Sequence, residues 1–102
     1  MKLNVFERLI LLQVLPAEGN FVTLRIVKDL KGIVALSETD FKEFDVTQVG
    51  EQVKWNEKGN EDREVEIGEK ATDIVIESLK KLDKEKKLTE QHFTLYEKFV
   101  KE

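Results

Sequence analysis

The spacing of the apolar residues changes twice along this chain, and that change limits its fold more than any other feature. Up to Val46 apolar residues recur every three or four positions, as on a helix. Between residues 53 and 67 they alternate with polar residues, as on a strand, and from Glu69 the helical spacing returns. The 102 residues suit one domain. We therefore predict a single compact α+β domain over residues 1–102, mostly helical, with one antiparallel β-hairpin between N-terminal helices and a C-terminal α-hairpin.

The first predicted helix covers Leu3–Leu15 and ends at Pro16. Its first half carries a polar face, formed by Asn4, Glu7 and Arg8. Leu11 and Leu15 fall on the same side one turn further on, so the second half is apolar nearly all round. Such a helix is either the centre of the fold or shared with a second subunit. We predict that Leu11 and Leu15 form a homo-oligomer interface.

The next segment, Asn20–Val27, fits two kinds of secondary structure. Its apolar residues alternate with Thr and Arg as in a strand, whereas the apolar residues from Val22 to Val34 also follow helical spacing. Length favours the helix, but the spacing leaves both interpretations open. The segment Ser37–Asp45 then begins with a near match to a capping box and predicts a short helix, on which Phe41 and Phe44 share a face.

The predicted hairpin has strands around Val53–Trp55 and Val65–Ile67, joined by the polar loop 57–63. One face of it is apolar and must pack on the helices, because a lone hairpin is marginal in water. The aromatic residues of the chain fall on the predicted inward faces. If one of them reaches the surface, we expect it to be Trp55, because half a hairpin is often open and tryptophan often anchors interfaces.

The C-terminal third predicts two helices that form an α-hairpin. The first helix runs from Glu69 to about Lys86 and has one apolar stripe, which contains Ala71, Ile74, Val75, Leu79 and Leu82. Thr89 is a suitable N-cap for the second helix. Both helices are therefore expected to pack against each other and against the rest of the core.

The order of helices followed by a hairpin is that of a winged helix-turn-helix, which suggests a regulator associated with nucleic acid. The charges oppose this function. The segment 38–45, in the place of the recognition helix, has four acids and one base, and the predicted wing 57–66 has five acids and two bases. Phosphate neutralisation supplies most of the affinity of DNA-binding proteins. These charges disfavour nucleic acid as a partner, and a winged-helix regulator associated with nucleic acid is the alternative function.

Acidic residues cluster in the middle of the chain. Residues 38–73 hold twelve acids and five bases, whereas the other 66 residues hold nine acids and twelve bases. Such a surface is either simply solvated or directed toward a basic protein partner. The predicted partner-binding residues are Glu38, Asp40, Glu43, Trp55, Glu57, Glu61, Asp62, Glu64 and Glu66.

One basic cluster lies at the end of the predicted helix 69–86. Lysines at a helix C-terminus are stabilised by the helix dipole without any ligand. If the cluster binds an anion, a phosphorylated small molecule suits it better than duplex DNA, because no arginine or aromatic residue accompanies it. The predicted anion-binding residues are Lys80, Lys81, Lys84 and Lys87.

The residue inventory offers little for catalysis. The chain has no cysteine, one histidine (His92) and two serines, and it contains no phosphate-binding glycine loop and no zinc-ligand spacing. We expect no enzymatic activity, no cofactor and no metal site. The absence of cysteine suits a reducing cytoplasm. No apolar stretch approaches the length of a membrane span, and charged residues interrupt the N-terminal apolar region that a signal peptide would need.

Three segments resemble short proteins encoded by bacteriophages and prophages. These are Met1–Leu9, Gly68–Ile74 and Leu88–His92. The resemblance implies a setting, in which small proteins bind host or phage machinery in the bacterial cytoplasm, and it assigns no activity to any residue. We therefore predict a non-catalytic, self-associating regulator, adaptor or inhibitor of a protein partner.

Overall fold

A computed structural model describes residues 1–101 and confirms a mostly helical α+β fold with two small antiparallel sheets. The helices are α1 (Val5–Val14), α2 (Phe21–Val34), α3 (Glu38–Glu43), α4 (Glu69–Lys84) and α5 (Phe93–Phe99), with the 3₁₀ turns η1 (Glu57–Asn60) and η2 (Glu90–His92). The strands are β1 (Lys2–Leu3), β2 (Thr47–Val49), β3 (Gln52–Lys54) and β4 (Arg63–Glu64).

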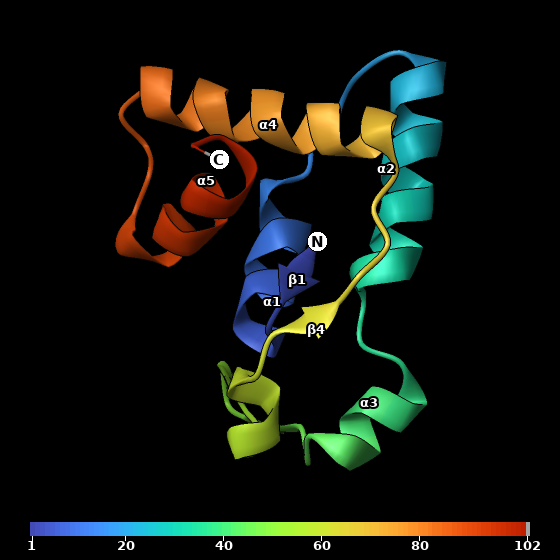
Figure 1. Ribbon diagram of the computed structural model, residues 1–102, viewed down its shortest axis with the longest axis vertical. Coiled ribbons are helices and arrows are strands. Elements are labelled where there is room, and N and C mark those ends of the chain that lie inside the picture. Colours follow the sequence, from blue (N-terminus) through green and yellow to red (C-terminus); the bar gives the residue numbers. More distant parts are fainter. Residues whose placement is uncertain (102) are drawn as a thin grey trace.

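Helix α1 lies at the centre of the molecule and contacts α2, α4, α5 and η1 (Figure 1). Helix α4 crosses one end of the long axis, with α5 packed beneath it. Helix α2 runs along the long axis, with its first turn near α4 and its last turn leading to α3. The short helix α3 and the turn η1 occupy the opposite end. The fold therefore has a helical end and an end built from short elements.

The core forms around α1 and corrects the predicted oligomer interface. Leu11 is 0% exposed and Leu15 is 6% exposed. Both belong to a buried cluster that also contains residues of α2, α4 and α5, among them Leu30, Leu79 and Leu95. The two leucines are thus buried by their own chain and leave no face for a second subunit. The other interpretation of an all-round apolar helix, the centre of the fold, is the correct one.

The polar face expected on α1 is also buried. Asn4 and Glu7 form a capping box at the start of the helix, and Glu7 is only 1% exposed. The Glu7 carboxylate accepts a hydrogen bond from Lys98 Nζ on α5 at 2.7 Å, and the same Nζ donates to Lys2 O at 2.9 Å and to Asp62 Oδ2 at 3.1 Å. Lys98 therefore joins the start, the middle and the last helix of the chain.

The surroundings of Lys98 shift its pKa. Partial burial alone would lower the pKa of this ammonium, but the hydrogen bonds and charges of Glu7 and Asp62 outweigh burial and hold the pKa above its usual value of 10.5. Lys98 is therefore charged throughout the physiological pH range, as a counter-ion to a buried carboxylate must be.

The strands pair differently from the prediction. β3 does pair in a hairpin, but its partner is β2, with Gln48 opposite Val53. Gly50 has φ +63°, which lets a two-residue loop turn the chain between Val49 and Gln52. The expected second strand begins earlier, at Arg63, and β4 pairs with β1 instead. The loop expected at 57–63 is mostly the turn η1, which Asn56 caps.

The remaining elements follow the expectations with small shifts. Of the two interpretations of Asn20–Val27, the helix is correct: Asn20 caps α2, and residues 21–27 form its first half. Helix α4 and the elements after Thr89 pack together as the expected α-hairpin. Thr89 caps the turn η2, and His92 Nδ1 accepts a hydrogen bond from the Thr89 N–H at 3.0 Å. Over residues 1–101, none of the helices combines the length and the apolar character that crossing a membrane requires.

Candidate interaction surface

An apolar groove lies between α1, α3 and the hairpin. It has a volume of about 340 Å³. Its apolar lining comes from four parts of the chain: Leu9 and Leu12 of α1, Ala35 and Leu36 of the link to α3, Phe41 of α3, and Val46 and Val53 at the hairpin. The only polar residues that line it are Thr47 and Gln48. Such a lining suits apolar side chains of a ligand or a partner.

Arg8, a side chain only 9% exposed, connects the elements that surround this groove. Its Nε donates to Val34 O at 2.8 Å, and its Nη2 donates to Ala35 O at 2.9 Å. Both carbonyls belong to the C-terminal end of α2, where helix carbonyls lack partners. The same Nη2 contacts Asp40 Oδ2 on α3 at 3.2 Å. Arg8 thereby holds α1, the end of α2 and α3 in one arrangement.

Further contacts join the end of α3 to the segments that follow the hairpin. Phe44 is buried directly after α3, with the Arg63 guanidinium 5.0 Å from its ring centroid. Arg63 also pairs with Glu43 at 2.8 Å. The Asn56 side chain donates to Glu43 O at 3.0 Å, and its backbone N–H donates to Phe44 O at 2.8 Å. These contacts hold the end of α3 against Asn56, which follows the hairpin, and against β4.

Several of the acids predicted to face a partner instead bind their own chain. Asp40 pairs with Arg8, Glu43 with Arg63, Asp62 with Lys98, and Glu64 with the Met1 ammonium at 2.7 Å. In the part of the chain that the structure describes, no ion pair includes the other four predicted acids, which are Glu38, Glu57, Glu61 and Glu66. Half of the predicted acids thus form ion pairs within the chain, and the other half do not.

The contacts of the Asp40 carboxyl lower its pKa. Partial burial alone would raise the pKa of Asp40, but hydrogen bonds from the Ser37 N–H and hydroxyl and the charge of Arg8 together hold the pKa below the usual 3.8. A carboxyl with a lowered pKa stabilises the fold above its unfolded pKa and loses that contribution as the pH falls through the folded pKa.

Replacing Asp40 with asparagine is therefore expected to lower the free energy of unfolding at pH 7 by about 1–2 kcal/mol, since a charge-assisted hydrogen bond and part of a cap are lost. The difference from the wild type should shrink below pH 3.8. Urea unfolding at several pH values measures it. Asp29→Asn, on the exposed side of α2, is the control and should change little. A difference that stays constant down to pH 2 would contradict the role of the charge.

The aromatic residues are not all buried, which corrects a further expectation. Trp55 is half-buried, with its ring centroid 6.4 Å from that of Phe6 and its Nε1 donating to Asn60. The turn η1 passes so close to this ring that a Cβ on Gly59 would collide with it. The exposed rings are those of Phe21, Phe41 and Phe93, at 79%, 48% and 63%. Phe41 of α3 forms part of the groove and lies at its rim, whereas Phe44, directly after α3, is buried.

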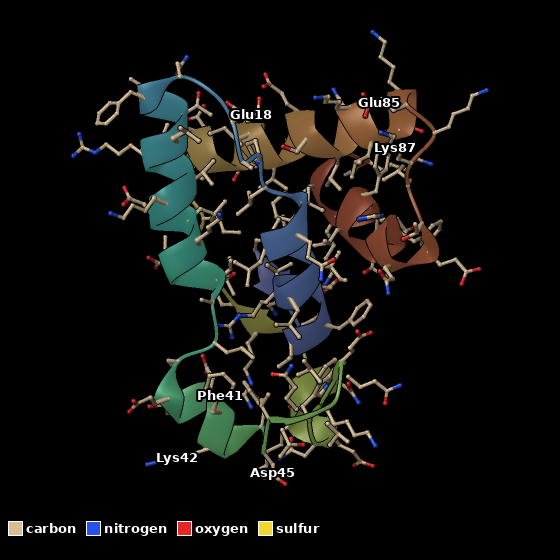
Figure 2. All side chains as sticks on the ribbon, turned by 180° about the vertical axis from the view of Figure 1, so that it is seen from behind. Glu18, Phe41, Lys42, Asp45, Glu85 and Lys87 are labelled. Carbon is tan, nitrogen blue, oxygen red and sulfur yellow. The ribbon has the colours of Figure 1, made fainter. Side chains whose placement is uncertain are left out.

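The predicted anion-binding lysines stand away from this groove. Lys80, Lys81, Lys84 and Lys87 are exposed at the end of α4 and just after it. Figure 2 shows Lys87 and Glu85 at the end of the molecule opposite Phe41 and Asp45, and the Lys87 and Glu85 side chains pair at 4.0 Å. The carbonyl end of a helix carries partial negative charge, so it adds no attraction for an anion.

A second hollow, of about 380 Å³, lies between the end of α4 and α5. Four of its polar residues contact one another in pairs: the Tyr96 hydroxyl donates to Asp83 at 3.2 Å, and His92 Nδ1 accepts from the Thr89 N–H. Partial burial and this bond to Asp83 raise the pKa of Tyr96 above its usual 10.0. Two carboxylates, Asp83 and Glu97, line the hollow beside one lysine. That charge balance disfavours a phosphorylated ligand.

The winged-helix order is present, but its surfaces do not suit DNA. The hairpin that follows α3 is 47–54 and not the segment 57–66 that was expected to be the wing. Helix α3 has only six residues, and Glu38, Asp40 and Glu43 outnumber its single lysine. A recognition element of this length and sign offers few contacts to phosphate.

In comparisons with family models, with curated proteins and with solved structures, nothing matches this chain.

Proposed function

We propose that this protein is a non-catalytic binding protein, a regulator, adaptor or inhibitor, whose groove receives an apolar segment of a protein partner. One observation carries the proposal: the groove is apolar nearly throughout, and its rim exposes Phe41 and Val53 to solvent. Burial of apolar surface contributes about 25 cal/mol per Å², so covering this groove would favour association. Exposed apolar patches of this kind commonly mark interaction sites.

The charges around the groove favour a partner with basic residues beside its apolar ones. The segment 38–54, which supplies much of the lining, holds five acids and two bases. Two of these acids are paired within the chain, and Glu38, Asp45 and Glu51 stay available. Complementary charge raises the rate of association and helps to exclude acidic partners. A helix with apolar residues on one face and Lys or Arg on its flanks fits this chemistry.

The setting is part of the same proposal. The lack of cysteine agrees with action in the cytoplasm, and the resemblance to small phage-encoded proteins agrees with a binding role. The nucleic-acid and phosphorylated-ligand alternatives receive less support, because the acidic α3 opposes the first and the carboxylates beside the second hollow oppose the second.

A photo-cross-linking experiment tests the groove. Phe41 is replaced by benzoylphenylalanine, which keeps an aromatic ring at the rim, and the cells that produce the protein are irradiated. A discrete protein adduct is expected at position 41. The matched control is the same replacement at Phe93, an exposed phenylalanine on α5 outside the groove, where that adduct should be absent or much weaker. Equal adducts at both positions, or none at position 41, would overturn the proposal.

A further inference from the structure

We infer that the groove's occupant is a second copy of this chain, which docks the exposed first half of its α2, so that copies join head to tail. This inference rests on the proposed function of the groove and names its partner. The expected assembly is weak and concentration-dependent, because one groove and one half-helix bury less surface than a standard stable interface of about 1,600 Å².

The first half of α2 exposes apolar side chains that its own fold does not use. The helix buries Val27, Leu30 and Val34 against the core. On its other side Phe21 is 79% exposed, and Val22 and Leu24 are also exposed. Phe21 has the largest exposed fraction among the exposed large apolar side chains of the described residues. An exposed ring on a rigid helix is the kind of anchor that apolar grooves bind.

The spacing on α2 matches the helix-in-groove mode of recognition. Phe21, Leu24, Arg25 and Lys28 lie at positions i, i+3, i+4 and i+7 of the helix, and together with Asp29 they line one shallow surface. The four residues at this spacing face the same way. We call these four residues the α2 patch. Two of its members are apolar and two are basic. This is the partner chemistry that the groove favours: apolar anchors with positive charge on the flank.

Charge also decides which surfaces pair. The segment 20–32 holds three bases and one acid, whereas the segment 38–54 holds five acids and two bases. Two α2 patches facing each other would bring like charges together, and so would two grooves; both arrangements are disfavoured. Patch against groove brings opposite charges together. The contact is therefore heterologous, with a different surface on each copy, and not a two-fold dimer.

The position of the two surfaces supports the same arrangement. Figure 1 shows α2 along the long axis, with its first turns at the end near α4 and with α3 at the other end. Phe41 lies at that other end (Figure 2). Each copy thus carries its patch and its groove toward opposite ends, and filling one leaves the other open. Repeated contacts of this kind give an open chain of copies, or a ring where the rotation closes.

Sedimentation velocity over a range of protein concentrations tests the inference. The wild type is expected to sediment faster as its concentration rises, and added salt should weaken the effect. Phe21→Asp puts negative charge into the patch, and Val53→Lys puts positive charge into the groove. Each variant alone should remain monomeric at all concentrations. Phe41→Lys is a second groove variant, in case the change at position 53 disturbs the hairpin.

Mixing the two variants gives the decisive result. Phe21→Asp keeps an intact groove and Val53→Lys keeps an intact patch, so an equimolar mixture should form a heterodimer and nothing larger. The controls are Phe93→Asp on α5 and Val49→Lys, whose side chain lies on the other face of the hairpin from Val53. Both controls should associate like the wild type.

Three outcomes overturn the inference. The first is a wild type that stays monomeric at all concentrations. The second is association that only one of the two variants abolishes, because that result indicates a two-fold contact. The third is a mixture that stays monomeric although both variants fold. Cross-linking at position 41 separates this failure from failure of the proposed function. An adduct with another protein keeps the groove as a binding site, whereas an adduct of two copies is expected here.

Discussion

Replacing Leu11 with alanine is expected to lower the free energy of unfolding by about 3 kcal/mol, measured by urea unfolding at low protein concentration. The side chain is fully buried at the centre of the helical core, beside residues of α2, α4 and α5. Its removal leaves a cavity that these helices cannot easily fill. For a domain whose total stability is about 5–10 kcal/mol, this is a large loss.

The comparison with Leu12→Ala sharpens this result. Leu12 follows in the same helix, lines the groove and is only partly buried, so its truncation should cost clearly less than that of Leu11. Leu11→Ala should leave the self-association of the folded protein unchanged, because the Leu11 side chain does not reach the surface. A Leu11→Ala protein of unchanged stability but reduced self-association would restore Leu11 to an interface.

The second large effect is expected for Lys98→Met, at about 3 kcal/mol of lost stability at pH 7. Methionine keeps much of the side-chain volume but removes the only ammonium that contacts the Glu7 carboxylate among the described residues. The carboxylate is left buried with the Asn4 N–H as its remaining donor. A buried charge without its counter-ion destabilises the fold by more than the intact pair stabilises it. Thermal or urea unfolding measures the loss.

A double variant separates this cause from simple loss of packing. Glu7→Gln combined with Lys98→Met removes both charges and should recover part of the stability. Lys81→Met, at an exposed position on α4, is the control and should be nearly neutral. Because the pKa of Lys98 is raised, the wild type should lose the contribution of the pair only as the pH rises above 10.5. A double variant no better than the sum of the two single changes would contradict the charge argument.

The helices could be predicted because each has a strong local signal. The apolar stripe of α4 repeats over four turns. Ser37 and Thr89 are N-cap residues that mark the starts of α3 and η2. Strand pairing has no such signal here. The sequence shows where residues alternate, but β4 pairs with β1 about sixty positions away, and the real hairpin depends on a two-residue turn at Gly50. The number and kind of elements were thus predictable, and the partners of the strands were not.

The charges illustrate the same limit at the surface. Composition located the acids, but it could not indicate that Asp40, Glu43 and Asp62 lie within reach of basic side chains from other segments. The groove was missed altogether, because its concavity arises where three elements meet. One signal was present: two phenylalanines, Phe41 and Phe44, lie three positions apart at a short helix, and only Phe44 is buried. The α2 patch was equally concealed, since its apolar residues fit the inward stripe as well as the outward one.

The contacts of Lys98 also order events in time. A ribosome makes α1 first, with Glu7 already in place, whereas the ammonium that neutralises this carboxylate is added some ninety residues later. Until then, no contact with Lys98 connects Lys2, Glu7 and Asp62. Contacts between residues far apart in sequence form slowly, because closing a long loop costs conformational entropy. We therefore expect the N-terminal helices to be loosely packed during synthesis, with exposed apolar surface. The last helix converts this loosely packed state to the native state, so truncation before residue 98 should favour aggregation over folding.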